Sequence, residues 1–456
     1  MFPSSYSLAV ASYSLLFVLQ SLHVMAIPTI SAVGSKFFTS NGDQWYIKGV
    51  AYQLVPHDPL IDTEQCKLDA SLMKELGANA IRVYHVDADG DHKGCMSAFA
   101  DAGIYLFVDL DDFDTQIEQT SPHWNNNQFE AFKKVLDEFQ QYDNTAGVFV
   151  GNEVLTTDQG SPAAPYVLAA ARDIKAYRDS KGYRKIPVGY SAADIAQLRP
   201  MLQNYMACSS NASERLDFFS LNAYEWCGDS SYTTSGYSEL QKNATDYPIP
   251  IFFSETGCNT PKPRTFQDQS AIFGSEMSGT WSGSIIYEWI QEANDYGLIN
   301  YGPYNPNAGS NSIVQDGYTR QGTPTPILPD FNNLKSQWAT LTPTGVALSE
   351  YSASAAKVTF PPCPASTSGG WQVNPSSPLP SLGQTLGKEG TKPTNTASAS
   401  ATGTGASSTD AAASSTSSAK SGAAGRATVA GLSRADGLGS IVVFLCGLVG
   451  VVSFLL

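Results

Sequence analysis

The stretch AGVFVGNEV at residues 146–154 combines the two features that decide the fold, an apolar run and a carboxylate at its end. IPIFFSET at residues 249–256 repeats the pattern, so Glu153 and Glu255 each follow a run of apolar residues. Continuous apolar runs, without the alternation of a half-exposed strand, indicate strands that are buried on both faces of a parallel sheet. Each carboxylate then lies at the end of a buried strand, where an unpaired charge would be costly.

Runs of this kind recur along the chain and alternate with stretches of helical spacing. The runs are 44–53, 78–84, 104–110, 146–154, 186–191, 218–224, 249–255 and 284–290. Between them, 128–142 and 166–181 have the apolar spacing that is typical of amphipathic helices. Eight strand–helix units in one domain predict an α/β fold, the (β/α)8 TIM barrel. A doubly wound open sheet is the alternative, but no GxGxxG motif or phosphate-binding loop follows the first run.

The composition limits the class of partner. The chain has 456 residues, with 27 Lys and Arg against 42 Asp and Glu and a formal net charge of −15. A surface that binds nucleic acid needs a basic face, and so does attachment to anionic lipid by charge, so we expect neither. With 42% hydrophobic residues, the chain has enough apolar area for a large core.

Both ends of the sequence are typical of targeting segments. Residues 1–26 contain no Lys, Arg, Asp or Glu and end in Val24-Met25-Ala26, which predicts a secretory signal peptide although the usual basic start is missing. A short membrane anchor is the alternative for this segment. Residues 431–456 end in an uncharged apolar tail that follows small residues and a polar spacer, which is the layout of a GPI-attachment signal. A tail-anchored membrane protein is the alternative there.

Between these parts the composition changes once more. Residues 366–430 are rich in Ser, Thr, Ala, Gly and Pro and nearly free of large apolar side chains. Such a segment cannot bury enough surface to fold, so we expect a disordered, O-glycosylated stalk. The folded domain is therefore predicted to span residues 27–365.

The number of cysteines fits a secreted protein. Six lie in the part expected to be secreted, and the seventh, Cys446, lies in the tail that GPI attachment would remove. An even set fits an oxidising compartment, and six cysteines allow fifteen pairings. No CxxC motif or Cys/His cluster indicates a metal, and no cofactor is expected. Sequons at Asn211 and Asn243 predict N-glycosylation.

In such a barrel the chemistry lies at the carboxyl ends of the strands. Glu153 and Glu255 end the fourth and seventh predicted strands and should face each other across the barrel mouth. Cleavage of a glycosidic bond requires such a pair, since one carboxyl protonates the leaving oxygen and the other attacks the anomeric carbon or activates water. Asn152, next to Glu153, would donate to a sugar 2-hydroxyl, a contact that strengthens in the transition state.

Aromatic and further polar residues end the other predicted strands. The aromatic ones are Tyr84, Tyr224, Trp226 and Tyr287, and the polar ones include Arg82, Asp109, Asp194, Asn222 and Glu288. Each aromatic residue taken singly is more typical of a core, because Tyr and Trp bury well when their polar atom finds a partner. Together with two Glu and no basic cluster, they favour a neutral polysaccharide as substrate.

Several motifs in the same order resemble the fungal β-1,3-glucanosyltransferases, glycoside hydrolase family 72. They are RVY at 82–84, GNE at 151–153, NAYEWC at 222–227, FSETGC at 253–258 and EANDYG at 292–297, within a resemblance that runs from about residue 30 to residue 363. The resemblance implies a secreted, often GPI-anchored (β/α)8 enzyme of the cell wall. Such an enzyme cuts a β-1,3-glucan internally and joins the new reducing end to the non-reducing end of another glucan, with retained configuration.

The resemblance also implies roles for single residues. Glu153 would be the general acid/base, which also activates the acceptor hydroxyl, and Glu255 would be the nucleophile. Tyr84, Asn152 and Tyr287 would contact the donor glucan, Tyr224 would lie near the nucleophile, and Asp194 and Arg199 would hold the acceptor. The implied disulfides are Cys66–Cys95, Cys227–Cys258 and Cys208–Cys363.

Two features depart from the family pattern. The segment DLDDFDTQI at 109–117 differs from the usual Leu-Ser-x-Pro, so the donor contacts of this loop are not carried over. Many members have a second, cysteine-rich carbohydrate-binding module, whereas here the chain passes from Cys363 into the predicted stalk, so we expect that module to be missing.

The predicted function is therefore a cell-wall β-1,3-glucanosyltransferase. A retaining endo-β-1,3-glucanase and a non-catalytic wall glucan-binding protein are the alternatives, because the two Glu motifs do not distinguish transfer from hydrolysis. The expected partners are donor and acceptor β-1,3-glucan chains and, through a GPI anchor, the outer face of the plasma membrane. We expect a monomer.

Overall fold

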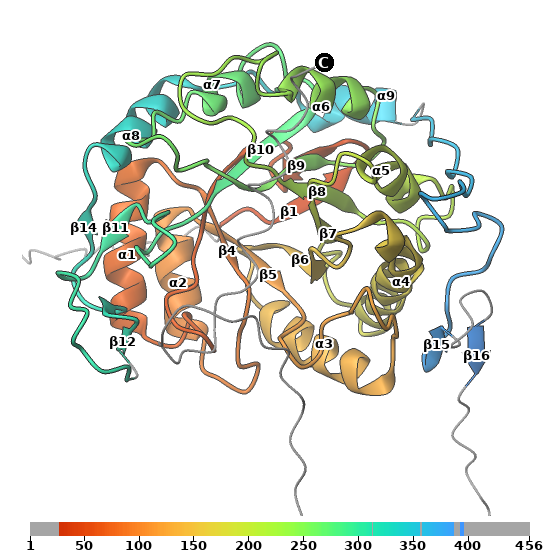
Figure 1. Ribbon diagram of the computed structural model, residues 1–456, viewed down its shortest axis with the longest axis horizontal. Helices are drawn as coiled ribbons and strands as arrows, with labels where there is room; N and C mark the ends of the chain where they lie inside the picture. The colour runs from red at the N-terminus through yellow and green to blue at the C-terminus, as the bar shows by residue number, and fades with distance from the viewer. Residues whose placement is uncertain (1–26, 312, 356–357, 387–392, 396–456) are drawn as a thin grey trace, which may run out of the picture. The chain divides into compact units, whose positions relative to one another are not determined.

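The computed structural model describes residues 27–395 except 312, 356–357 and 387–392 (Figure 1). The predicted signal peptide at 1–26, the predicted GPI signal at 431–456 and the predicted stalk from residue 396 onward lie outside the described residues.

Eight parallel strands close into a barrel in the order β10-β3-β4-β5-β6-β7-β8-β9. They are β3 (Ile47–Ala51), β4 (Ala80–Val83), β5 (Tyr105–Asp109), β6 (Thr145–Asn152), β7 (Val188–Ala193), β8 (Phe218–Asn222), β9 (Ile251–Thr256) and β10 (Trp281–Ile286). Each overlaps one of the predicted runs, so the TIM barrel is confirmed. The pairing of β10 with β3 closes the sheet and excludes the doubly wound alternative.

Helices surround the barrel in Figure 1. They are α1 (Thr63–Leu76), α2 (Lys93–Ala102), α3 (Asn126–Phe139), α4 (Ala164–Ser180), α5 (Arg199–Ala207), α6 (Tyr237–Ala244), α7 (Asp268–Ile272) and α8 (Asp330–Thr340), with α9 (Leu348–Ala355) and the 3-10 helix η1 (Asp158–Ala163). Helix α3 begins at a capping box, in which Asn125 and Gln128 each accept a backbone N–H of the other. The two predicted helices correspond to α3 and α4.

A hairpin closes the amino-terminal end of the barrel. It consists of β1 (Ile30–Val33) and β2 (Lys36–Thr39), paired antiparallel. Phe37 of β2 is fully buried, and its ring lies 6.2 Å from that of Phe107, 5.9 Å from that of Phe218 and 6.0 Å from that of Phe252. Aromatic side chains thus fill the barrel interior at this end.

Short strand pairs and disulfides secure the segments outside the barrel. The pairs are β11 (Ile299–Asn300) with β14 (Thr325–Pro326), β12 (Val314–Gln315) with β13 (Tyr318–Thr319), and β15 (Gln384–Leu386) with β16 (Pro393–Asn395). The three disulfides that the resemblance implies are all present, Cys66–Cys95, Cys208–Cys363 and Cys227–Cys258. The last joins the loops that follow β8 and β9.

The predicted end of the folded domain at residue 365 is placed too early. We call residues 363–384 the strap, because this segment packs along the outside of the barrel. Trp371 is fully buried, with its ring 5.4 Å from that of Tyr205 in α5, and the N–H of Gln372 donates to Ser161 Oγ of η1 (3.0 Å). The average composition of 366–430 predicts disorder, although the segment includes Trp371. This one side chain supplies the buried apolar area that the rest of the segment lacks.

The strap continues past α4 towards the start of α3. Arg172 of α4 donates through Nη2 to the carbonyl of Pro380 (2.8 Å), and the N–H of Gly383 donates to the carbonyl of Trp124 (2.8 Å). These contacts, together with Cys208–Cys363 at its beginning, hold the strap at several points.

The two sequons differ in their surroundings. Asn211 is exposed, and its Oδ1 accepts from the hydroxyl of Ser213 in the same sequon (2.9 Å). Asn243 is half-buried in the last turn of α6. Within the described part of the chain, no helix has the length and apolar character to cross a bilayer.

Candidate active site

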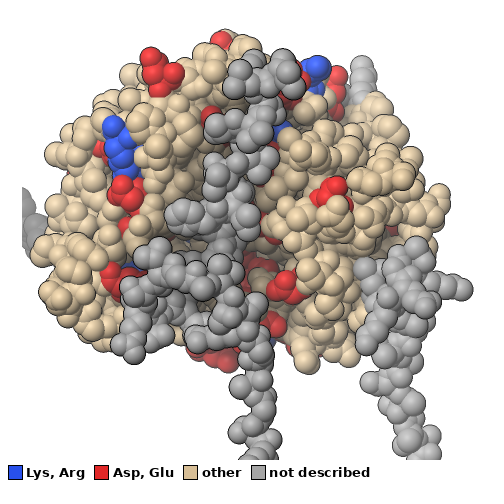
Figure 2. Space-filling model, viewed as in Figure 1, with Lys and Arg blue, Asp and Glu red and all other residues tan. Residues whose placement is uncertain are grey.

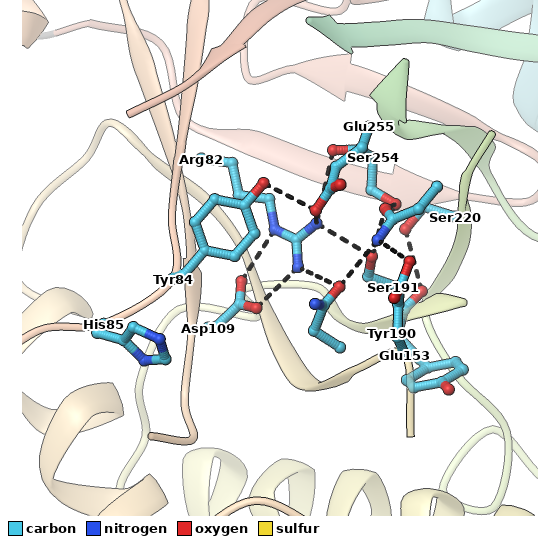
Figure 3. A network of polar contacts seen from close by, with 12 residues as sticks. Arg82, Tyr84, His85, Asp109, Glu153, Tyr190, Ser191, Ser220, Ser254 and Glu255 are labelled. Carbon is cyan, nitrogen blue, oxygen red and sulfur yellow. Dashed lines mark hydrogen bonds and ion pairs between the residues drawn. The ribbon is translucent and has the colours of Figure 1, made fainter. Parts of the chain in front are cut away.

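A polar network joins the carboxyl ends of neighbouring barrel strands from β4 to β9 (Figure 3). Its centre is Arg82 of β4, which donates to side chains from β5, β6, β7 and β9. The predicted pair Glu153 and Glu255 belongs to this network, at the ends of the fourth and seventh strands of the barrel, β6 and β9. The strand numbering predicted from the sequence is thus confirmed.

Glu255 is nearly buried, with 8% of its surface exposed. Its Oε1 accepts from the Tyr84 hydroxyl (2.9 Å) and lies 3.4 Å from Arg82 Nη1, while Oε2 accepts from the Tyr224 hydroxyl (2.8 Å). Burial raises the pKa of Glu255 to about 7, the charge of Arg82 opposes this rise, the charge of Glu153 adds to it, and the two tyrosine hydrogen bonds lower it. Protonation of Glu153 therefore makes Glu255 easier to ionise.

Glu153 has an unusual backbone. Its φ of 47° lies in the left-handed region, which costs energy for a residue with a Cβ and is often found at functional sites. Its N–H donates to the carbonyl of Ser191 (2.8 Å), and its Oε1 accepts from Asn222 Nδ2 (3.0 Å). Burial raises the pKa of Glu153, against the opposing effects of the Asn222 hydrogen bond and the charge of Arg82.

Arg82 is a fully buried charge that is paired on several sides. Its Nε and Nη2 donate to the two carboxylate oxygens of Asp109 (3.1 and 2.8 Å), a bidentate pair. Nη1 donates to Ser191 Oγ and Nη2 to Asn152 Oδ1, both at 3.0 Å. Burial disfavours the charge, but Asp109 more than offsets this and the pKa of Arg82 is raised. The guanidinium is therefore a permanent cation beside Glu255.

Asn222 connects the two ends of the network. Its Nδ2 donates to Glu153 Oε1 (3.0 Å) and to Asn152 Oδ1 (3.1 Å). Its Oδ1 accepts from the hydroxyls of Ser191 (2.9 Å) and Ser254 (2.8 Å). Since both its amide groups are engaged, the orientation of Asn222 is fixed, and with it the positions of Glu153 and Asn152.

The predicted aromatic residues divide into two groups. Tyr287, which follows β10, lies edge-to-face with Tyr224, and both contact Tyr296 at ring distances of 5.4 and 5.7 Å. Trp226 is half-buried and packs against Tyr237 at 5.2 Å. The tyrosines therefore line the site beside Glu255, whereas Trp226 packs against the core.

Asp194 and Arg199 form a separate pair. Arg199 Nη1 lies 2.8 Å from Asp194 Oδ1 and donates to Oδ2 at 2.9 Å, between the end of β7 and the start of α5. No hydrogen bond or ion pair among the described residues joins this pair to Glu153 or Glu255. The structure thus brings six of the eight predicted site residues together and leaves these two on the β7 side.

Some residues of the network could not be given a role from the sequence. Arg82, Asp109 and Asn222 stood among the polar strand-end residues, and a charge inside the apolar strand AIRV at 80–83 was the strongest available signal. Ser191 and Ser254 gave no signal, because serine is common in strands and only the neighbouring strand shows its partner. Among the described residues, no group of three His, Cys, Asp or Glu could hold a metal ion.

A (β/α)8 barrel with a half-buried and a nearly buried carboxyl at the ends of its fourth and seventh strands is an architecture typical of glycoside hydrolases. The chain belongs to the glucanosyltransferases of glycoside hydrolase family 72, since the model of this family matches residues 19–341.

Relatives with assigned names support this placement. The 1,3-beta-glucanosyltransferase gas2 of Schizosaccharomyces pombe is 40% identical over 356 residues, which are 75% of this chain and 73% of the relative. The 1,3-beta-glucanosyltransferase PGA5 of Candida albicans is 40% identical over 348 residues, 71% of this chain and 52% of the relative. The chain thus spans between about half and three quarters of the length of these two relatives.

A solved structure is similar as well. Saccharomyces cerevisiae Gas2p, as a mutant in complex with laminaritetraose and laminaripentaose, is 38% identical, with a TM-score of 0.68 over 77% of this chain and 74% of that one.

Proposed function

We propose that this protein is a cell-wall β-1,3-glucanosyltransferase. It cuts a β-1,3-glucan internally and transfers the new reducing end to the non-reducing end of another β-1,3-glucan, with retained configuration. The observation that carries the proposal is the unequal surroundings of two carboxyls, Glu153 and Glu255, at the mouth of a family 72 barrel. Glu255 has a cation and two tyrosine donors, whereas Glu153 accepts from a neutral amide.

The unequal surroundings assign the roles. The charge of Glu153 raises the pKa of Glu255, so the two carboxyls do not readily ionise together and the pair carries one negative charge. Arg82, Tyr84 and Tyr224 donate to Glu255 and stabilise a negative charge there, whereas a neutral amide donates to Glu153, so we assign the charge to Glu255 and the proton to Glu153. Glu255 is then the nucleophile and Glu153 the general acid, as retention requires.

In the first step, Glu255 attacks the anomeric carbon of the donor while Glu153 gives its proton to the leaving oxygen. A covalent glucosyl-enzyme forms and the reducing-end fragment departs. Asn152 Oδ1 is occupied by Arg82 and Asn222, so its Nδ2 is the group that can donate to the sugar 2-hydroxyl. Tyr84 and Tyr287 contact the donor, and Tyr224 releases Glu255 Oε2 as the new bond forms.

In the second step, a hydroxyl of the acceptor glucan attacks the same carbon. Glu153, now ionised, takes the proton from this hydroxyl, and Glu255 leaves. Transfer exceeds hydrolysis only if the acceptor is held in line, and positioning of this kind contributes up to about 7–11 kcal/mol. Asp194 and Arg199, on the β7 side of Glu153, are the groups that hold the acceptor.

The location of the enzyme belongs to the same proposal. It is secreted through its signal peptide and held by a GPI anchor at the outer face of the plasma membrane, where it acts on wall glucan as a monomer. Three disulfides in the folded domain support an oxidising compartment. Asn211 is the better placed of the two glycosylation sites, because it is exposed outside any helix.

The test follows the chain length of reduced β-1,3-gluco-oligosaccharides incubated with the secreted protein. Products longer than the starting chain indicate transfer, shorter products alone indicate an endo-glucanase, and no change indicates a binding protein. We expect longer products, and a loss of both activities in Glu255→Gln. In Glu153→Gln the rate should fall by about 10²–10⁴.

Glu130→Gln is the matched control, because Glu130 has a 63% exposed side chain on α3. It should keep the activity of the parent protein. Near-normal turnover by Glu255→Gln would show that the nucleophile has been misassigned.

A further inference from the structure

Phe113 is the most exposed large apolar side chain among the described residues, with 72% of its surface accessible. It lies in the loop between β5 and α3, where the sequence departs from the family pattern, and exposed carboxylates flank it at Asp112 and Asp114. A single exposed apolar residue needs no explanation by itself. The residues around Phe113, however, indicate a role in binding.

The turn that carries Phe113 is fixed by hydrogen bonds. Asp112 Oδ1 accepts from the N–H of Asp114 (2.9 Å), the N–H of Thr115 (2.9 Å) and the hydroxyl of Thr115 (2.8 Å). The N–H of Asp112 in turn donates to Thr115 Oγ1 (3.0 Å). The ring is therefore held in place by a closed turn, which lowers the entropy lost when a ligand packs on it.

His85 connects Phe113 to Tyr84 of the active site. The His85 ring lies 4.2 Å from that of Phe113, and His85 directly follows Tyr84, which donates to Glu255. Gln53 Oε1 accepts from the N–H groups of both Tyr84 (2.9 Å) and His85 (3.1 Å), so the two residues are positioned together. Figure 3 shows His85 on the side of Tyr84 that faces away from the two catalytic carboxyls.

We propose that Phe113 and His85, which we call the Phe113 platform, hold a glucose ring of the donor β-1,3-glucan beyond the ring that reacts at Glu255. The inference rests on the proposed function and adds a binding subsite to it. An aromatic face packs against the C–H face of a sugar, and the exposed carboxylates of Asp112 and Asp114 accept hydrogen bonds from sugar hydroxyls. The same carboxylates repel an anionic polysaccharide and so select a neutral glucan.

The strand order places the platform on the donor side. His85 follows β4, Phe113 follows β5 and Asp194 follows β7, and β6 with Glu153 lies between β5 and β7. In the proposed function, Glu153 protonates the bond that is cut, and the acceptor binds at Asp194 and Arg199 on the β7 side of β6. Because Asp194 and Arg199 hold the acceptor side, the Phe113 platform faces the donor.

The test compares Phe113→Ala and Phe113→Tyr in the secreted protein, with laminari-oligosaccharides of increasing length as donors. For Phe113→Ala we expect KM to rise about three- to ten-fold for long donors, as the loss of one aromatic contact predicts, with kcat within about two-fold. Donors too short to reach the platform should be unaffected. Phe113→Tyr keeps the ring and should behave as the parent.

Leu68→Ala, at a 43% exposed position on α1, is the matched control for loss of an exposed apolar side chain. Binding of a long oligosaccharide to Glu255→Gln, with and without Phe113→Ala, separates affinity from turnover. An unchanged KM, cleavage pattern and affinity in Phe113→Ala would overturn the platform while leaving the proposed function intact. If the parent protein neither binds nor remodels laminari-oligosaccharides, the proposed function itself fails.

Discussion

Arg82 shows how a single residue organises this site. It is a fully buried cation in a short strand, and the side chains that satisfy it come from β5, β6, β7 and β9. Breaking a buried pair by removing one partner is strongly destabilising, whereas a change that keeps the charge mainly alters geometry. The informative substitution therefore keeps the charge.

We predict that Arg82→Lys lowers kcat at least about ten-fold, because an ammonium cannot hold Asp109 in a bidentate pair and reach Glu255 at the same time. Weaker contact with Glu255 should also raise the pKa of this carboxyl. Since Glu255 must be ionised to attack, the acidic limb of the kcat–pH profile should move to higher pH. Kinetics at several pH values measure both effects.

The control is Arg172→Lys, at a partly exposed arginine that pairs with Asp173 (2.8 Å). We expect its pH profile to be that of the parent. An unshifted acidic limb in Arg82→Lys would contradict the placement of Arg82 as the residue that positions and charges Glu255.

At this scale the sequence could predict the two carboxyls but only part of their surroundings. Glu153 and Glu255 were identifiable because each ends an apolar run, which makes a carboxylate conspicuous. Ser191 and Ser254 were not, because their hydroxyls matter only through Asn222 on the neighbouring strand. Such contacts depend on the register between neighbouring strands, which cannot be derived from a single sequence.

Among the elements, the strap and the β1–β2 hairpin were not predicted, whereas the eight barrel strands were. The strands have long apolar runs, but β1 and β2 have only four residues each, too few for a periodic pattern. The strap has no periodicity at all and depends on Trp371. Its contact with Ser161 joins it to η1, in the segment that follows Glu153.

We predict that Trp371→Ala releases the strap. Truncation of a buried aromatic side chain typically costs about 3–5 kcal/mol, and the strap has few other apolar contacts to replace it. Limited proteolysis should therefore cut the variant within 363–384, and hydrogen exchange should increase at 158–163. Leu382→Ala, at a 37% exposed position of the same strap, should leave both unchanged. Equal protection of the two variants would show that Trp371 does not hold the strap.

The whole molecule combines acidity with buried groups that hold protons. Asp and Glu are prominent on the face shown in Figure 2, and the net charge is −15. Burial raises the pKa of Asp69 and of Asp268 to about 6, and that of Glu255 to about 7. Burial opposes the charge of His92, but its contacts with Asp58 (2.8 Å) and Glu138 (3.0 Å) more than offset this, so its pKa is raised.

The raised pKa values of these groups all make the folded state less stable as the pH rises. Unfolded Asp and Glu titrate near pH 4, so between pH 4 and 7 the folded state binds more protons at Asp69, at Asp268 and at the Glu153–Glu255 pair, which shares one proton. Stability therefore falls as the pH rises. The contribution of His92 is complete below its unfolded pKa of about 6.5 and is lost as the pH rises through its higher folded value. Asp179, with a pKa lowered beside Arg178, acts oppositely but only below about pH 4.

We therefore predict that the protein is more stable at pH 5 than at pH 8, with a Tm about 5 °C or more higher. One pKa unit corresponds to about 1.4 kcal/mol, and at an unfolding entropy of about 2.1 cal/mol/K per residue 1 kcal/mol corresponds to about 1–2 °C in a domain of roughly 360 residues. Repulsion between acidic groups adds to the difference at pH 8. Thermal melts across this range measure it. Glu255→Gln removes one carboxyl of the Glu153–Glu255 pair, which then no longer has to share a proton, so its Tm should fall less between pH 5 and pH 8 than that of the parent. A Tm that stays constant or rises from pH 5 to pH 8 would contradict the prediction, because the folded state would then not be holding the extra protons that burial of these groups requires.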